Sequence, residues 1–346
     1  MATTLQYQLT KKGGPFNLVK VPKAAPDSKQ VAIRMKAVAL NPLDWKQLDT
    51  GLMITKWPTV LGYDGSGIVE AVGADVTKFK AGDEVFANFR SDHSEVKEQA
   101  AFQEVAIIPE QHISLKPKKL SFEEAASLPV GYVTAANAVF CVLKVPLPFV
   151  AEMKHMKCPH EYKSILVLGG SSSVGASVIQ LLRLSLPAVT IITTSSPAHN
   201  DRLKELGATT VLSYKDLSLI SDIKGATPDG RGVDAIIDTV ASAASQTDIF
   251  ESFSQEGPKI YGEVATEFSG QISPPEGVTR NIIMAADIFG TPGGGEVLYA
   301  LGQLIEDGKF VVPVKVEVVG YGFDAIGLGV EKLRAGVSGT KLVVSL

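Results

Sequence analysis

The chain has 346 residues, more than a single hydrophobic core usually serves, and this length predicts two domains. Its 33 lysines and arginines against 37 aspartates and glutamates give a formal net charge of −4. Since no long run of one sign occurs, a nucleic-acid partner and an anionic membrane partner are both disfavoured.

The N-terminal residues, MATTLQYQLTKKGG, lack the basic segment and apolar core of a secretory signal. No stretch is expected to be long and apolar enough to span a membrane. The two cysteines, Cys141 and Cys158, have no companion ligands at metal-binding spacing and form no disulfide framework. A cytoplasmic protein is therefore predicted.

Short apolar runs separated by Gly and Pro extend from Val31 to about Ile113 and predict a compact β domain. The pattern changes at Ser121, where Glu124 three residues later indicates a capping box that starts a helix. The proline-rich segment 142–162 is expected to be a loop with a short helix.

Strands and helices alternate between Ile165 and Val240, with helices expected over 176–184 and 198–206. This alternation predicts parallel βαβ units and a doubly wound sheet. Two further apolar runs, 257–264 and 281–290, are expected to extend the sheet. A helix over 296–308, a strand over 310–319, and a final helix, turn and strand from 323 to 346 complete the predicted order.

The stretch 165–175, ILVLGGSSSVG, joins an apolar strand to a glycine- and serine-rich turn that opens a helix. Such a turn offers close backbone approach and helix N-terminal N–H groups to a pyrophosphate. Its spacing is looser than G-x-G-x-x-G, so the loop alone suits a dinucleotide and an ordinary strand–turn–helix connection equally. The expected pyrophosphate contacts are Gly170, Ser171, Ser172, Ser173 and Val174.

The ribose position favours NADPH over NADH. A site for NAD usually places Asp or Glu about 20 residues past the glycine loop, where the carboxylate holds the ribose diol. Ser195 stands 20 residues after Gly175, and a carboxylate at this place would repel a 2′-phosphate. His199, Arg202 and Lys204 add positive charge nearby. Helix periodicity puts His199 on the side of Ser195 and turns Lys204 toward solvent. The expected contacts are Ser195, Ser196 and His199.

Six segments occur in order along the chain: AVALNPLDWK from Ala37, VLGYDGSGIVEAVG from Val60, FKAGDEVF from Phe79, AASLPVGYVTAA from Ala125, LGGSSSVG from Leu168 and LRAGVSGTKLVVSL from Leu333. Together they resemble the medium-chain dehydrogenase/reductase superfamily, specifically its zinc-independent enoyl reductase and quinone oxidoreductase branches. The chain looks most like fungal reductases of polyketide pathways, including trans-acting enoyl reductases.

The resemblance implies an α/β fold with two domains. A GroES-like β-barrel catalytic domain would comprise residues 1–130 and 292–346, and a Rossmann NADPH-binding domain with a doubly wound parallel sheet would comprise residues 131–291. The active cleft is expected between them, in keeping with the placement of ligands at the carboxyl ends of parallel strands.

The resemblance also indicates that the catalytic zinc of related alcohol dehydrogenases is missing. Those enzymes take a Cys at the position of Asn41 and a His at the position of Tyr63. Catalytic zinc needs three protein ligands, so no metal site is expected. The four-cysteine structural lobe is replaced by residues 89–100, whose lone His93 is typical of a surface histidine.

Without a Lewis acid, direct alcohol or ketone chemistry is harder than hydride addition to an activated C=C bond. We therefore expect NADPH-dependent reduction of an α,β-unsaturated carbonyl or enoyl thioester, in secondary metabolism. Such a substrate would be a small enone, or an acyl thioester presented by a carrier protein or polyketide synthase. Quinone reduction and a cofactor-binding role with little catalysis are the alternatives.

Three residues are candidate catalytic groups. Lys46 resembles a lysine near the cofactor of related reductases, and its ammonium suits a hydrogen-bond donor better than a base; the alternative is a solvated lysine beside structural Asp44. Tyr63 presents a hydroxyl to the substrate or merely packs. Thr134 approaches the nicotinamide or bonds the backbone in the first turn of a helix.

Tyr214 resembles a family tyrosine that flanks the adenosine phosphate, although an aromatic residue at a strand end is also ordinary. The resemblance adds Tyr132 as a substrate contact. The run 281–295 is expected to line the substrate pocket through Met284 and Phe289, or to pair across a homodimer, so a monomer and a homodimer both stay open. Further cofactor contacts are expected at Pro42, Asp44, Lys46, Thr134, Val240, Val264 and Ser338.

Overall fold

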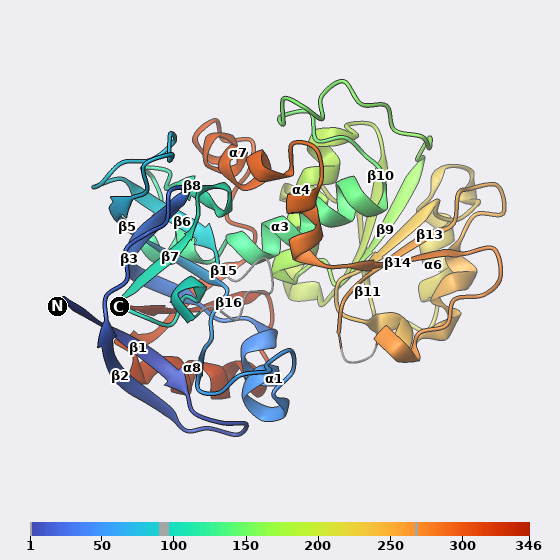
Figure 1. Cartoon of the computed structure of the whole chain (residues 1–346). Coiled ribbons are helices and arrows are strands. Elements are labelled where there is room, and N and C mark those ends of the chain that lie inside the picture. The colour runs from blue at the N-terminus through green and yellow to red at the C-terminus, as the bar shows by residue number, and fades with distance from the viewer. Residues whose placement is uncertain (1, 90–96, 267–268) are drawn as a thin grey trace. The chain divides into compact units, whose positions relative to one another are not determined.

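The computed structural model describes residues 2–89, 97–266 and 269–346 (Figure 1). The chain divides into two compact units, one formed by residues 1–130 with 298–346 and the other by residues 131–297. The predicted domains change at residues 130/131 and 291/292. The structure places the second change at residues 297/298, six residues later than predicted and inside helix α7 (Gly294–Glu306).

The first unit is built on a mostly antiparallel seven-stranded sheet of order β15-β16-β3-β5-β6-β8, with β7 also pairing with β3. Two strands from the C-terminal part of the chain complete this sheet beside strand β3 (Figure 1). The register sets Val343 opposite Ala39. The strands are β3 (Gln30–Ala39), β5 (Asp64–Val72), β6 (Glu84–Asn88), β7 (Val105–Pro109), β8 (Ile113–Leu115), β15 (Lys315–Tyr321) and β16 (Thr340–Ser345).

Small residues allow β5 to lie close against β3. A Cβ on Gly67 would lie 2.2 Å from the carbonyl oxygen of Arg34, a distance that no other residue tolerates. A second sheet of order β2-β1-β4 covers the same core, in which Leu9, Val60 and Ile326 are fully buried. Its strands are β1 (Thr3–Leu9), β2 (Phe16–Pro22) and β4 (Thr59–Val60), and the helices of the unit are α1 (Pro42–Thr50), α2 (Phe122–Ala126) and α8 (Asp324–Arg334).

The capping box predicted at Ser121 starts helix α2. The backbone N–H of Glu124 donates to Ser121 Oγ at 3.1 Å, and the N–H of Ser121 donates to the Glu124 carboxylate at 2.9 Å. The helical run 122–142 that follows is long and apolar enough to cross a membrane, so the expectation that no stretch would reach this length was wrong. Because 83% of its most apolar window is buried inside the protein, we interpret the run as core.

The second unit contains a six-stranded, wholly parallel sheet of order β11-β10-β9-β12-β13-β14. The predicted doubly wound arrangement is present, since the order turns back between β9 and β12. In such sheets, ligands bind outside the carboxyl ends of the strands at this reversal. The strands are β9 (Ser164–Leu168), β10 (Thr190–Ser195), β11 (Thr210–Ser213), β12 (Ala235–Asp238), β13 (Ile260–Val264) and β14 (Thr279–Ile283).

Helices flank this sheet and connect its strands. Five residues of β9, SILVL, are all buried, as expected for a central parallel strand covered on both faces. The α-helices are α3 (Pro129–Asn137), α4 (Ser173–Ser185), α5 (Asn200–Glu205) and α6 (Leu219–Gly225), followed by α7. A π-helical turn, Ala138–Val142, follows α3, and the 3₁₀ turns described in this unit are Pro197–His199, Pro228–Gly230, Ser242–Ala244, Thr247–Ser252, Ser269–Gln271 and Ala285–Gly290. The first unit has 3₁₀ turns at Lys97–Gln99 and Glu110–His112.

Four local predictions differ from the structure. The described segment 143–163 contains turns and bends but no helix, in keeping with its prolines. The helix expected over 198–206 begins as a 3₁₀ turn at Pro197 and becomes α-helical only over Asn200–Glu205. In the run 281–290 the strand ends at Ile283 and a 3₁₀ turn follows. Strand β15 begins after Pro313, which has no N–H for a sheet ladder.

Candidate functional site

The glycine-rich turn between β9 and α4 is shaped for close approach by a ligand. Gly169 has φ of +76°, and a Cβ on Gly170 would lie 2.1 Å from Thr193 Oγ1. A Cβ on Gly175 would lie 2.4 Å from the carbonyl oxygen of Gly169. These positions therefore require glycine, and the backbone stays bare where a pyrophosphate would approach.

The turn also supplies hydrogen-bond donors at the start of α4. Ser172 caps the helix by accepting the N–H of Gly175 at 2.9 Å. By helix geometry, the N–H groups of Ser173 and Val174 have no acceptor within the helix. The buried Ser173 hydroxyl has no hydrogen-bond partner among the described residues. N–H groups without an acceptor in the helix, at the positive end of a 13-residue helix, are what an anionic phosphate requires, so the turn fits a dinucleotide.

Thr239 ties the end of β12 to this turn. Its Oγ1 donates to the Leu168 carbonyl at 2.8 Å and lies 2.9 Å from Ser172 Oγ. The next residue, Val240, is half exposed, and a Cβ on Gly169 would lie 2.6 Å from its side chain. Val240, named as a cofactor contact from the sequence, therefore lies beside the turn, while Thr239 was missed.

The end of β10 lies next to the same turn. The N–H of Gly170 donates to the Thr194 carbonyl at 3.0 Å, which brings Ser195 and Ser196 to this edge of the sheet. The Ser195 side chain is buried and donates to the Ser196 carbonyl at 3.2 Å. Ser196 is half-buried and is therefore the more accessible hydroxyl of the two.

Strand β11 adds a cation that the sequence reasoning overlooked. Ser213 is in register with Ser195, so Tyr214 and Lys215 follow directly at the neighbouring strand end. Both side chains are exposed, and Lys215 Nζ lies 5.6 Å from the centre of the Tyr214 ring. His199 is half-buried at the end of the 3₁₀ turn, and Lys204 is exposed on α5.

The other predicted residues of this unit lie on separate elements. Thr134 is buried in the second turn of α3, not in its first. Tyr132 is fully buried on the same helix, and burial raises the pKa of its hydroxyl. Val264 ends strand β13. Met284 directly precedes the 3₁₀ turn Ala285–Gly290 and Phe289 lies within it, and the side chains of Met284 and Phe289 are half-buried.

In the first unit, α1 carries several of the predicted residues. Pro42 occupies its first position, where no backbone N–H is needed. Asp44 is fully buried and accepts the Asn41 N–H at 2.7 Å, so it caps the helix. Lys46 is half-buried on the same helix, with its Nζ 5.6 Å from the centre of the Trp45 ring. Ser338 is exposed between α8 and β16.

A buried charge network lies at the N-terminal end of α1. Lys341 Nζ donates to Asn41 Oδ1 at 2.6 Å and to Asp64 Oδ2 at 2.8 Å. Asp64 also accepts Asn41 Nδ2 at 2.9 Å and the N–H of Val130 at 2.7 Å. The Asp64 side chain is 0% and the Lys341 side chain 7% exposed. Such a pair persists in the interior because each group keeps several hydrogen bonds.

Tyr63 stands one residue before Asp64, at the position that the resemblance assigns to a zinc ligand in related enzymes. It is 8% exposed, and its hydroxyl accepts a hydrogen bond from Gln47 Nε2 at 3.0 Å. Within residues 2–89, 97–266 and 269–346, no three His, Cys, Asp or Glu side chains cluster as metal ligands would. His93 lies outside the described residues.

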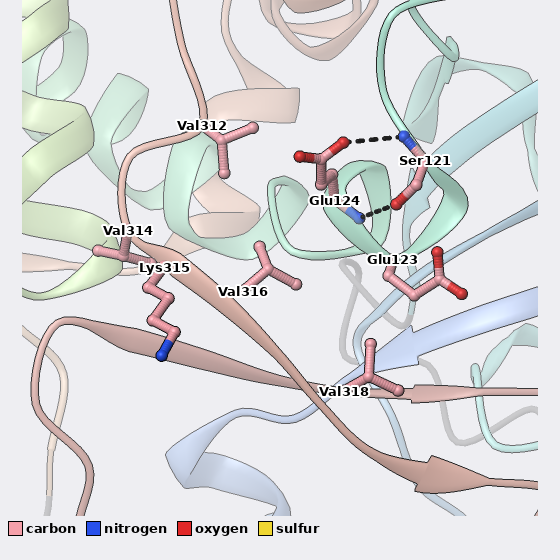
Figure 2. A pocket seen from close by; sticks show the side chains of 8 residues that line it. All are labelled: Ser121, Glu123, Glu124, Val312, Val314, Lys315, Val316 and Val318. Atoms are coloured by element: carbon pink, nitrogen blue, oxygen red, sulfur yellow. Dashed lines mark hydrogen bonds between the residues drawn. The ribbon is translucent and has the colours of Figure 1, made fainter.

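A depression of about 530 Å³ lies beside α2 and β15 (Figure 2). Its acidic side chains are engaged locally, because Glu124 completes the capping box and Glu123 accepts the Ser345 hydroxyl at 2.6 Å. None of the predicted site residues lines it. The lining residues are Ser121, Glu123, Glu124, Val312, Val314, Lys315, Val316 and Val318.

Comparisons with known proteins agree with this arrangement. Residues 27–118 match the family described as alcohol dehydrogenase GroES-like domain, and residues 173–260 match the family described as zinc-binding dehydrogenase. The enoyl reductase component lovC of the lovastatin nonaketide synthase from Aspergillus terreus is 34% identical over 92% of this chain and 89% of its own. The chain belongs to the medium-chain dehydrogenase/reductase superfamily.

Other members of the superfamily are similar over nearly the whole length. The trans-enoyl reductase himH of Aspergillus japonicus is 27% identical over 92% of this chain and 90% of its own. The quinone oxidoreductase of Coxiella burnetii has the same fold, with a TM-score of 0.75, 24% identity and full coverage of both chains. The predicted α/β fold, with a GroES-like unit and a Rossmann unit, is confirmed.

Membership makes the protein an oxidoreductase, and its Rossmann unit implies a nicotinamide cofactor. The site residues that sequence reasoning missed all depend on long-range contacts or on neighbouring strands. Lys341 and Asp64 are far apart in the chain, and Lys215 becomes visible only through the β10–β11 register. Gln47 follows Lys46 directly in the sequence, but its contact with Tyr63 joins residues 16 positions apart.

Proposed function

We propose that this medium-chain reductase transfers hydride from NADPH to the C=C bond of an α,β-unsaturated carbonyl or enoyl thioester in secondary metabolism. The observation that carries this proposal is the donor pair around α1: Lys46 on the helix, and Tyr63, whose hydroxyl is hydrogen-bonded to the same helix. Relatives named as enoyl reductases support the proposed reaction.

The chemistry requires donors because hydride addition at the β-carbon leaves negative charge on the carbonyl oxygen. NADPH, when bound, would supply the hydride. The Tyr63 hydroxyl and the Lys46 ammonium would donate hydrogen bonds to that oxygen, and donors fixed in place stabilise developing charge strongly. Thr134 would help to orient the nicotinamide.

Tyr63 and Lys46 could also donate hydrogen bonds to a quinone oxygen. Product analysis therefore decides between C=C reduction and quinone reduction. We would mix the protein and NADPH with a crotonyl-type thioester, an enone and a quinone, follow absorbance, and identify products by mass. Saturated thioester or ketone supports the proposal. Turnover of the quinone alone supports a quinone reductase, and no turnover of any substrate supports a cofactor-binding role.

The preference for NADPH is part of the proposal. No carboxylate occurs in the run Thr193–Ser196 at the end of β10, and Lys215 on the neighbouring strand end supplies a positive charge for a 2′-phosphate. Lys215→Ala should weaken NADPH binding about tenfold and leave NADH binding nearly unchanged, as expected when one charge-assisted contact is lost. Lys204→Ala is the matched control. Tighter binding of NADH than of NADPH to the wild type contradicts the preference.

A basic and apolar surface around α1 supports presentation of the substrate by an acidic carrier protein. The N–H of Gly13 donates to the Leu48 carbonyl at 2.7 Å and holds the β1–β2 turn against α1. No acidic residue occurs in 10–20 or 50–63. We call this surface the α1 basic patch, and its exposed members are Lys11, Lys12, Leu52, Met53 and Lys56.

Charge reversal tests the carrier proposal. Because an acidic partner would be repelled, Lys11→Glu combined with Lys12→Glu should lower kcat/KM for a carrier-bound thioester about tenfold at low salt. The kcat/KM for the free thioester should not change. Raising the salt concentration should reduce the difference in kcat/KM between the variant and the wild type with the carrier-bound thioester. Equal loss with both substrates contradicts a carrier contact here. A cytoplasmic location is proposed alongside, supported by the free thiols Cys141 and Cys158.

A further inference from the structure

Gln47 is a fully buried amide that contacts the candidate donor Tyr63. It lies on α1, where its carbonyl accepts the N–H of Gly51 at 3.0 Å and its side chain is 0% exposed. Its Nε2 donates to the Tyr63 hydroxyl at 3.0 Å. Gln47 Oε1 has no hydrogen-bond partner among the described residues. A buried amide with one end engaged by a tyrosine hydroxyl calls for an explanation.

The backbone of Tyr63 has little freedom of its own. Its carbonyl accepts the N–H of Phe89 at 2.7 Å and the Asn88 amide at 3.2 Å. Gly62 before it has φ of +100°, and a Cβ there would lie 2.4 Å from the Phe102 ring. The ring of Tyr63 therefore extends from a backbone that is held in place, and the Gln47 amide contacts the hydroxyl at its far end.

We propose that Gln47 is a positioning residue that holds the Tyr63 hydroxyl as a hydrogen-bond donor toward the substrate carbonyl oxygen; this rests on the proposed function. An amide N–H directed at the phenol oxygen occupies a lone pair and leaves the O–H bond pointing away from Gln47. Donation into a hydroxyl also polarises its O–H bond, so successive hydrogen bonds strengthen each other.

The chemistry of residue 47 sets the direction of this hydrogen bond. A carboxylate at residue 47 accepts hydrogen bonds only, so it would attract the Tyr63 proton and turn it away from the substrate. An apolar side chain of similar length would leave the proton unoriented. Gln47→Glu and Gln47→Met therefore separate donation by the amide from simple filling of space.

The test compares Gln47→Met, Gln47→Glu, Tyr63→Phe and the double variant Gln47→Met with Tyr63→Phe, with NADPH and a crotonyl-type thioester. Gln47→Met should lower kcat about tenfold and change KM less than threefold, since only the developing charge needs the donor. Gln47→Glu should lower kcat further. The double variant should be no slower than Tyr63→Phe alone, because both changes remove the same interaction.

A second readout does not depend on turnover. In protein labelled with ¹³Cζ-tyrosine, the resonance lost in Tyr63→Phe identifies Tyr63, and this resonance should shift in Gln47→Met. Thermal unfolding and NADPH affinity show whether each variant is folded. A folded Gln47→Met variant with an unmoved Tyr63 resonance overturns the inference.

The outcomes also separate this inference from the proposed function. A wild type that reduces the thioester, together with a Gln47→Met variant of equal kcat, overturns the role of Gln47 alone. If the double variant loses kcat by the product of the two single losses, the role of Gln47 is overturned as well, because Gln47 and Tyr63 then act independently. A wild type that reduces only the quinone overturns the proposed function and the donor role with it.

Discussion

At the scale of single residues, buried polar groups shape the candidate site more than apolar packing does. Asp64 and Lys341 are tolerated in the interior because Asn41 and the Val130 N–H complete their hydrogen bonds. Removing one partner of such a pair costs about 3–5 kcal/mol, because the other charge remains buried. These contacts hold Asp64, the residue that directly follows Tyr63.

Lys46→Ala tests the second donor. We expect kcat for the free enoyl thioester to fall about 100-fold, the scale on which loss of one oxyanion donor acts. The unfolding midpoint should stay within about 2 °C, because Lys46 is only half-buried. Lys20→Ala, an exposed lysine on β2, is the control. Unchanged steady-state kinetics in Lys46→Ala would refute the assignment.

Glu263 makes stability depend on pH. Burial is the main cause that raises the pKa of this carboxyl, and Asp238 adds to it, although Arg280 opposes both through a hydrogen bond of 2.7 Å from Nε. A carboxyl with a raised pKa destabilises the folded state when charged. This cost is absent below the pKa of the unfolded chain and grows as the pH rises through the folded value.

Arg280→Met should therefore be most harmful at neutral pH. Without the guanidinium, Glu263 carries an uncompensated buried charge, and we expect the free energy of unfolding to fall by about 2–3 kcal/mol at pH 7. The deficit should shrink as the pH falls toward 4, because protonation removes the charge. Urea unfolding of both proteins measures it. Arg202→Met, which breaks an exposed ion pair, should have almost no effect, and a pH-independent deficit in Arg280→Met would argue against this account.

At the scale of elements, the strand–turn–helix unit β9–α4 is the most constrained part of the nucleotide side. Its glycines are demanded by backbone neighbours and by Thr193, whose hydroxyl donates to the Val167 carbonyl at 2.7 Å and cannot easily move. The turn also depends on Thr239 from β12. Residues of three parallel strands or their ends, β9, β10 and β12, thus pack against the one glycine-rich turn.

Gly170→Ala checks this crowding. The added methyl would overlap Thr193 Oγ1, so we expect a loss of about 1–3 kcal/mol in unfolding free energy and weaker NADPH binding. Gly225→Ala is the matched control, because nothing lies within 4 Å of its Cβ position and alanine favours the helix. Both unfolding free energies are measured by calorimetry. Equal values for Gly170→Ala and Gly225→Ala would contradict the steric overlap with Thr193.

Sequence patterns predicted the elements better than their ends. The β9–turn–α4 unit and the capping box at Ser121 were predictable because their signals are local. Helix α5 begins later than predicted, since Pro197 starts a 3₁₀ turn. The contact of Lys341 with Asp64 joins residues 277 positions apart, and polar pairs at such separation leave no periodic trace. Gln47 was missed because its role depends on where Tyr63 lies.

At the scale of the whole molecule, each of the two units carries part of the proposed chemistry. The Rossmann unit contains the glycine-rich turn between β9 and α4, the strands β9 and β12 at which the order reverses, and Lys215. The GroES-like unit contains Lys46, Tyr63 and the buried charge network. The division at residues 130/131 and 297/298 puts both proposed donors, Lys46 and Tyr63, in one unit and the candidate pyrophosphate-binding turn in the other. Binding of NADPH should therefore slow hydrogen exchange more in the Rossmann unit than in the GroES-like unit.

NADPH should stabilise the protein through its nucleotide unit. At a concentration of 100 Kd, binding adds about 2.7 kcal/mol to the free energy of unfolding, and an equal concentration of NADH should add less. Hydrogen exchange should slow first in the amides of residues 169–175. Equal stabilisation by the two nucleotides, or slowing confined to residues 1–130, would contradict the assignment of this turn.

The strand that joins β3 comes from the far end of the chain, and this has a consequence during synthesis. Until β16 leaves the ribosome, β3 lacks its neighbour and Asp64 lacks its ammonium partner, which follows 277 residues later. The Rossmann unit, made of the continuous stretch 131–297, can fold as soon as it emerges. We therefore expect the nascent segment 1–130 to complete its sheet only after the Rossmann unit has formed and residues 298–346 have emerged.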